Sequence, residues 1–208
     1  MHLNFIKNTV LLFVLTLLSC RNQTNSQAQS PLRVGAQQTE TYLPILKNKT
    51  VGILANQTSV IFKEDGYTHL VDSLLSLNVA VKKVFAPEHG FRGIADAGEY
   101  VKDGVDSGSG VPIVSLYGAN KKPSAQALDG LDVIIFDVQD VGARFYTFLS
   151  TLHYMMETCT KLGITVLVLD RPNPNGHYVD GPILDLKYSS FVGVHPVPIV
   201  HGLTVGEY

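Results

Sequence analysis

The sequence predicts an α/β fold in which an open, mostly parallel sheet has helices on both faces. Two observations predict it. Short apolar runs of strand length alternate with stretches of helical spacing from residue 50 to residue 169, which is the pattern of a parallel sheet buried on both sides. The composition, with 45% hydrophobic and 16% charged residues in a chain of 208, is that of a globular protein.

Each element is expected from its own pattern. Apolar runs predict strands at 50–55, 79–85, 111–117, 132–137 and 164–169. Apolar residues at helical spacing predict a helix around 70–75 and a longer helix over 145–163, which Gly163 ends as a C-terminal cap. A short helical stretch is expected at 124–128. After Asp170 the alternation stops, and the chain becomes rich in proline and glycine.

The N-terminal segment is typical of an exported protein. Lys7 precedes the apolar run 9–18, which is too short to cross a bilayer as a permanent helix. The sequence Leu-Leu-Ser-Cys at 17–20 then resembles a bacterial lipobox, with Cys20 as the lipidated N-terminus; an ordinary signal peptide is the alternative. We therefore expect a protein of the bacterial cell envelope that is lipid-anchored to a membrane, either periplasmic or associated with the outer membrane.

The charge and the missing motifs exclude several classes of function. A formal net charge of −2 without a basic block argues against nucleic acid as a partner. The first strand is followed by neither G-x-G-x-x-G nor a Walker lysine motif, so no cofactor is expected. The G-x-S-x-G motif of a nucleophilic serine is also missing. No cysteine pair or H-E-x-x-H motif indicates zinc. A metal site would require the fold to gather residues that are distant in sequence, namely His89, Asp137, Asp140, Asp170 and His201.

The ends of the predicted strands indicate where the site lies. Polar residues follow four of the strands: Asn56, then Glu88 and His89, then Asp137 to Asp140, then Asp170 and Arg171. Ligands of open α/β sheets bind beyond the carboxyl ends of the strands. The sequence therefore predicts one site at this edge of the sheet.

Glu88 is the candidate for acid chemistry. It lies between Phe85 and Phe91 in the sequence, and burial among apolar side chains raises the pKa of a carboxyl group, which suits a general acid. Glycosidases pair such an acid with a second carboxylate, for which Asp140 and Asp170 are candidates by position. The alternative for a single aspartate at a strand end is a turn or a helix cap.

Other polar and aromatic side chains near the strand ends are candidates for substrate binding. Arginines would hold an acidic group bidentately or pair with structural carboxylates. Aromatic rings would stack on a sugar face or belong to the core. The candidates are Asn56, His89, Arg92, Tyr117, Arg144, Tyr146, Arg171 and His201.

Four motifs together resemble one family, the NamZ-like exo-β-N-acetylmuramidases. They are P-E-H-G-F-R-G at 87–93, D-V-Q-D-V-G-A-R-F-Y-T at 137–147, D-R-P-N-P-N-G at 170–176 and H-G-L-T-V-G-E at 201–207. The resemblance covers the chain from about residue 34 onward. It implies release of N-acetylmuramic acid from the non-reducing ends of peptidoglycan fragments, so that muropeptides or their disaccharides are the expected partners.

The resemblance also implies roles and an architecture. Glu88 would be the catalytic carboxylate. Our own choice for the residue that holds the lactyl carboxylate of this sugar is Arg92 or Arg171. A Rossmann-like N-terminal domain would form a cleft with a smaller C-terminal domain. The expected organisation is a signal peptide at 1–20, a polar tether at 21–40, a Rossmann-like catalytic domain at 41–185 and the start of the C-terminal domain at 186–208.

One departure from the family concerns length. Family members are much longer, so this chain is expected to be cut short within its C-terminal domain. Thr204 and Glu207 form the pattern of a capping box, the start signal of a helix. Two other functions stay open: a lipoprotein that binds a cell-wall sugar without cleaving it, and a metal-dependent hydrolase.

Overall fold

The computed structural model describes residues 32–93, 95–96 and 98–208. Residues 33–208 form one compact unit. The apolar run 9–18 and the lipobox with Cys20 lie outside the described residues, as does most of the expected tether. In the part of the chain that the structure describes, no helix is both long enough and apolar enough to cross a membrane.

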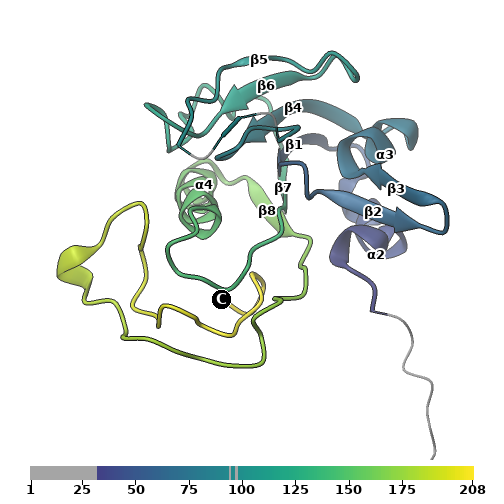
Figure 1. Ribbon diagram of the computed structural model, residues 1–208. Helices are drawn as coiled ribbons and strands as arrows, with labels where there is room; N and C mark the ends of the chain where they lie inside the picture. Colours follow the sequence, from purple (N-terminus) through teal and green to yellow (C-terminus); the bar gives the residue numbers. More distant parts are fainter. Residues whose placement is uncertain (1–31, 94, 97) are drawn as a thin grey trace, which may run out of the picture. The chain divides into compact units, whose positions relative to one another are not determined.

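A six-stranded sheet forms the centre of this unit, and a separate hairpin lies beside it (Figure 1). The sheet contains β1 (Thr50–Ala55), β4 (Ala80–Ala86), β5 (Gly104–Val105), β6 (Pro112–Ser115), β7 (Val133–Asp137) and β8 (Thr165–Val168). The hairpin pairs β2 (Val60–Lys63) with β3 (Gly66–His69). The helices are η1 (Gly35–Gln37), α2 (Thr39–Leu46), α3 (Leu70–Ser76), α4 (Phe148–Leu162) and η2 (Leu186–Tyr188).

The sheet is mostly parallel, as predicted. Its strand order is β5-β6-β4-β1-β7-β8, and only the short edge strand β5 runs antiparallel to its neighbour. The chain builds outward from β1 to β4 and β6, and then returns to the other side of β1 with β7 and β8. This order is the Rossmann-like arrangement, and it brings the carboxyl ends of five strands to one edge.

Two apolar clusters cover the two faces of the sheet, because side chains alternate along a strand. On one face, strand residues such as Ile53 and Ile135 pack with Leu70, Val71 and Leu74 of α3 and with Tyr42 and Leu46 of α2. On the other face, Leu54, Phe85, Ile134 and Phe136 pack with Phe148, Leu149, Leu152, Met155 and Cys159 of α4. The strands are therefore buried on both sides, which explains their nearly continuous apolar sequence.

The long helix begins and ends for clear reasons. α4 carries its apolar residues on the side that faces the sheet, as the periodicity predicts. It ends at Gly163, whose φ of 68° lies in the left-handed region that glycine adopts without strain. The amide groups of Gly163 and Ile164 then close the last turn by donating to helix carbonyls.

The structure differs from the sequence predictions at three places. Residues 125–130 form successive turns rather than a short helix. The β2–β3 hairpin was not predicted, and it is closed by a two-residue loop before Gly66. Helix α2 was also not predicted. Together with η1 it occupies 35–46, so the C-terminal part of the expected 21–40 tether belongs to the compact unit.

The N-terminal part of the unit is held by close packing. The amide of Gly35 donates to the carbonyl of Asp170 at 2.7 Å. A Cβ atom at Gly35 would lie within 2.8 Å of the backbone of Leu169 and Asp170, so only glycine permits this approach. Ala36 and Tyr42 are buried next to it. These contacts fix the position of the residues that were expected to be flexible.

The C-terminal segment contains little regular structure. It leaves the sheet after β8 and turns back on itself, and η2 is the one helix assigned in it (Figure 1, yellow-green to yellow). Isolated bridges join Val200 to Ala143 and to Asp180. The predicted capping box at its end is confirmed, since Thr204 and Glu207 bond each other's amide groups through their side chains. The boundary between 185 and 186 stays a prediction.

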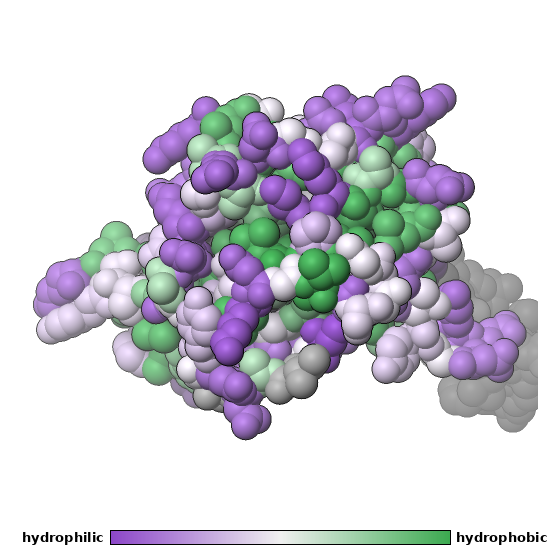
Figure 2. Space-filling view, turned by 90° about the horizontal axis from the view of Figure 1, so that it is seen from above, coloured by the Kyte–Doolittle hydropathy of each residue, from purple (hydrophilic) through white to green (hydrophobic). Residues whose placement is uncertain are grey.

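Figure 2 views the unit from above, the side on which β5 and β6 lie in Figure 1. Hydrophilic residues gather at the rim of this face and hydrophobic ones nearer its middle. Exposed apolar side chains are instead frequent on the C-terminal segment, where Val179, Ile183 and Tyr188 are each more than three-fifths exposed.

Candidate functional site

The carboxyl edge of the sheet gathers the polar residues that follow the strands. Asn56 directly follows β1, and Glu88 follows β4 after one proline. Asp140 lies beyond the end of β7, and Asp170 beyond the end of β8. Because these strands are parallel, their ends meet at the predicted edge. The side chains there have different environments. These environments distinguish the candidate site from the residues that have a structural role.

Glu88 has donors around its carboxylate. Thr147 donates through Oγ1 to Oε2 of Glu88 at 2.7 Å. The backbone amide of Gly98 donates to Oε1 at 3.1 Å. The hydroxyl of Tyr117 contacts the same carboxylate. Both carboxylate oxygens are therefore engaged, and the group has a fixed orientation.

These donors also set the charge of Glu88. Partial burial pushes the pKa of Glu88 upward, but the hydrogen bonds from Thr147, Tyr117 and Gly98 outweigh it, so the pKa lies below its ordinary value. The same contact raises the pKa of the Tyr117 phenol. The predicted rise in the pKa of Glu88 is therefore wrong. Polar donors rather than apolar side chains surround this carboxylate, and it is ionised at neutral pH.

A strained turn leads the chain away from Glu88. His89 has a φ of 69° and Gly90 a φ of 77°, and a residue with a side chain rarely adopts such values. Nδ1 of His89 lies 3.2 Å from the carbonyl oxygen of Ala95, on the far side of the turn. A cavity of about 460 Å³ begins at His89 and Gly90. Backbone strain of this kind is concentrated at functional sites.

Arg92 is bound to two carboxylates of the protein. Its guanidinium donates to both oxygens of Asp106, at 3.1 and 2.8 Å, and to both oxygens of Asp72, at 3.2 and 3.0 Å. Two further donors, the amide and the hydroxyl of Ser109, bind Asp106. This network closes the loop after Glu88, and the role of Arg92 in it is structural.

Arg171 lies beneath the sheet edge in a buried ion pair. Nε and Nη2 of Arg171 donate to the two oxygens of Asp137 at 2.6 and 3.0 Å, and Nη2 also donates to the carbonyl of Val60 at 2.9 Å. The side chains of Arg171 and Asp137 are 3% and 0% exposed. Arg171 has no exposed face, so the expectation that it binds substrate does not fit the structure.

At the switch point between β1 and β7, where the strand order reverses, residues of the protein bond to one another. Asn56 Oδ1 accepts from the amide and the hydroxyl of Thr58. The hydroxyl of Ser59 donates to the carbonyl of Asp137. Asn56 is completely buried. This is the place where Rossmann-like proteins bind dinucleotides. Here Oδ1 of Asn56 and the hydroxyl of Ser59 serve the fold, whereas Nδ2 of Asn56 is buried without a hydrogen-bond partner.

Asp140 and His201 form a second buried pair. Asp140 Oδ2 accepts from the amide of Gly142 at 2.8 Å and lies 3.8 Å from Nε2 of His201. Burial raises the pKa of Asp140 and lowers the pKa of His201, so it favours the uncharged form of each. Nδ1 of His201 accepts from the amide of Leu203. Both side chains are about 5% exposed or less, which sets them apart from the open edge at Glu88.

Asp170 serves as a cap for the last turn of the chain. It accepts from the hydroxyl of Thr204 at 2.6 Å and from the amide of Gly206 at 3.0 Å. The amide of Arg171 donates to it as well. These contacts match the structural alternative for an aspartate at a strand end.

Arg144 and Tyr146 lie at the border with the C-terminal segment. Arg144 donates to the carbonyls of Pro182 and Val197 and so anchors that segment. The ring of Tyr146 is 41% exposed and packs edge-on against Phe148.

The structure thus brings only part of the predicted site together. Tyr117 and His89 lie with Glu88, whereas Asn56, Asp140, Asp170, Arg92, Arg171 and His201 make structural contacts elsewhere at the edge. Sequence reasoning missed Thr147 and Gly98. The available signal for Thr147 was its place in the 137–147 motif just before the long helix.

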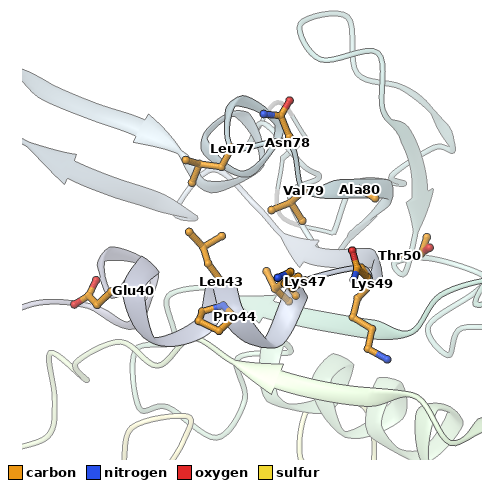
Figure 3. Close-up of a pocket in the computed structure, with 12 residues that line it drawn as sticks. Glu40, Leu43, Pro44, Lys47, Lys49, Thr50, Leu77, Asn78, Val79 and Ala80 are labelled. Carbon is orange, nitrogen blue, oxygen red and sulfur yellow. The ribbon is translucent and has the colours of Figure 1, made fainter.

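Another cavity lies elsewhere. About 750 Å³ in volume, it opens at the amino ends of β1 and β4, between Leu43 and Pro44 of α2 and Leu77 to Ala80 (Figure 3). Its rim carries Lys47 and Lys49, and no strand end delivers a functional motif to it. We place the site at Glu88, because charge, hydrogen bonding and strain coincide there. Among the residues described, no three His, Cys, Asp or Glu side chains are arranged to hold a metal ion.

Comparisons with known proteins show the family of the chain. Residues 51–208 match the family model described as exo-beta-N-acetylmuramidase NamZ, N-terminal. The chain is 44% identical over 168 residues to the peptidoglycan beta-N-acetylmuramidase NamZ of Bacillus subtilis, covering 80% of this chain and 40% of that protein.

Two solved structures of DUF1343 family proteins from Bacteroides fragilis are also similar. One has a TM-score of 0.72 and 48% identity over 85% of this chain, and the other a TM-score of 0.74 and 34% identity over 84%. This chain spans 45% and 44% of their lengths. The chain therefore belongs to the NamZ exo-β-N-acetylmuramidase family and corresponds to the N-terminal part of its members.

Proposed function

We propose that this protein is an exo-acting glycoside hydrolase that releases N-acetylmuramic acid from the non-reducing ends of peptidoglycan fragments, with Glu88 as a catalytic carboxylate. The oriented, ionised carboxylate of Glu88 is the observation that carries the proposal. Family membership and the name of the Bacillus subtilis relative support the class of reaction.

The chemistry of glycoside hydrolysis explains why such a carboxylate is useful. The transition state resembles an oxocarbenium ion, and a carboxylate beside it acts as nucleophile, as base or through its charge. Glu88 is partly exposed at the edge of the sheet, and the residues after it, His89 and Gly90, line a cavity, whereas Asp140 and Asp137 are buried. Of these carboxylates, Glu88 is the one that a sugar can reach.

The test uses the protein as its gene encodes it and a chromogenic N-acetylmuramic acid glycoside. Glu88→Gln should lower kcat roughly 100- to 10,000-fold with little change in melting temperature, because the amide is nearly isosteric. Glu64→Gln, an exposed glutamate in the turn between β2 and β3, is the matched control and should keep wild-type activity.

Other outcomes separate the rival functions. If the wild-type protein bound the sugar but released no product, the function would be that of a sugar-binding lipoprotein and not of an enzyme. Loss of activity with a chelator would favour a metal-dependent hydrolase. If Glu88→Gln lowered the melting temperature and kept turnover within a few-fold of wild type, Glu88 would be a structural acid.

We also propose that Cys20 carries a lipid anchor and that the protein belongs to the bacterial cell envelope. The support is the sequence: a cationic start, a short apolar run and the Leu-Leu-Ser-Cys motif at 17–20. A polar segment follows before the compact unit begins at Arg33. A polar segment between the lipid anchor and the compact unit would allow the catalytic unit to reach peptidoglycan from a membrane.

A further inference from the structure

Thr147 occupies the N-cap position of α4 but does not cap the helix. An N-cap threonine normally accepts a hydrogen bond from an amide of the first turn. Here the side chain makes no such bond. Its hydroxyl instead donates to Oε2 of Glu88 at 2.7 Å, across 59 residues of sequence.

This contact is built into the fold. Thr147 is 7% exposed, and α4 packs along the sheet through Phe148, Leu149 and Leu152. The position of the hydroxyl is therefore fixed by the helix and not by a mobile loop. A local rule of helix formation is broken at this residue, and such exceptions are expected at functional sites.

We infer that Thr147 is a positioning residue that holds Glu88 in place as a carboxylate for the reaction. The inference rests on the proposed function. The hydroxyl has one proton to donate, and in this geometry the acceptor is Oε2. The amide of Gly98 holds the other oxygen, so the carboxylate is fixed from two sides.

The contact has a consequence for the pH dependence of activity. A donor to the charged form of a carboxyl group lowers its pKa, and Thr147 contributes to the lowered pKa of Glu88. Removing the hydroxyl should therefore raise the pKa of Glu88. The acidic limb of the kcat/KM profile should then move to higher pH, because a larger fraction of Glu88 is protonated at a given pH.

The experiment compares Thr147→Val, Thr147→Ser and Thr158→Val in the protein as its gene encodes it, with a chromogenic N-acetylmuramic acid glycoside. Thr147→Val should lower kcat roughly 10- to 100-fold with little change in KM, which is the effect of losing one hydrogen bond to a charged group. Thr147→Ser should keep the activity and the pH profile. Thr158→Val removes another buried hydroxyl of α4, one that donates to the carbonyls of Pro123 and Tyr154, and should leave kcat unchanged.

The outcomes distinguish this inference from the proposed function. Wild-type kcat and pH profile in a folded Thr147→Val would overturn the role of Thr147, even if Glu88→Gln is inactive. Full activity of Glu88→Gln would overturn the proposed function itself. A shift of the alkaline limb alone would refute the assignment of Glu88 as the group that acts in its ionised form. If Thr147→Val does not fold, Thr147→Ala removes the hydroxyl with less bulk and decides between the same outcomes.

Discussion

Replacing Arg171 by methionine should destabilise the fold without weakening substrate binding. Methionine has a similar length and no charge, so Arg171→Met removes the bonds to Asp137 at 2.6 and 3.0 Å and the bond to the Val60 carbonyl at 2.9 Å. Asp137 would then be a completely buried carboxylate without a counter-charge.

The magnitude follows from the burial of the pair. Removing one partner of a buried ion pair costs roughly 3–5 kcal/mol, because the remaining charge has lost its partner in a medium of low dielectric constant. In a domain of this size about 1 kcal/mol shifts the melting temperature by about 2–4 °C. The expected fall for Arg171→Met is therefore roughly 6–20 °C.

Thermal unfolding followed by circular dichroism measures this fall. Arg33→Met is the control, because its pair with Glu40 is more than half exposed on both sides and its loss should leave the melting temperature almost unchanged. A double variant, Arg171→Met with Asp137→Leu, should recover part of the loss by removing the unpaired charge. If Arg171→Met melted like Arg33→Met and raised KM for the acidic sugar, Arg171 would face the substrate and the structural assignment would be wrong.

Two further predictions concern acid stability and the membrane anchor. Hydrogen bonds from Arg92, and to a smaller extent from Ser109, hold the pKa of Asp106 far below its ordinary value. This carboxylate therefore stabilises the fold above the unfolded pKa of about 4 and loses that contribution as the pH falls toward the folded pKa. Asp106→Asn should therefore be less stable than wild type at pH 7, and their unfolding free energies should converge between about pH 5 and pH 2; parallel curves from urea titrations would contradict this. Cys20→Ala should move the protein out of the membrane fraction, and retention there would refute lipidation.

The fold could be predicted where the signal is periodic. The strands at 50–55 and 132–137 and the helix before Gly163 were found, because each has a continuous apolar run or an apolar stripe. The β2–β3 hairpin was missed although Asp65-Gly66 is a turn signal, since its strands are short and largely exposed. Helix α2 was missed because Pro44 lies within it and its first residues resemble the polar segment before them.

The position of the site was also predictable, but its partners were not. Parallel strands place their carboxyl ends at one edge, so the sequence could assign Glu88 and Asp170 to the same side of the sheet. Which side chains touch depends on the lateral order of the strands and on the path of each loop. Arg171 was predicted to face a ligand and instead pairs with Asp137, 34 residues earlier, because β7 and β8 are neighbours.

Glu88 shows why neighbours in sequence do not define the environment of a carboxylate. Phe85 packs into the apolar cluster beneath α4, and Phe91 packs into the cluster on the opposite face of the sheet. Neither ring therefore belongs to an apolar pocket around the carboxyl group. The strained turn at His89 leaves the carboxylate at the edge, where donors from two distant segments reach it, the hydroxyl of Tyr117 and the hydroxyl of Thr147. A carboxylate that is ionised before substrate binds has no proton to give. In the proposed glycosidase Glu88 therefore suits the role of nucleophile, base or charge stabiliser, and the proton for the leaving group has to come from another acid.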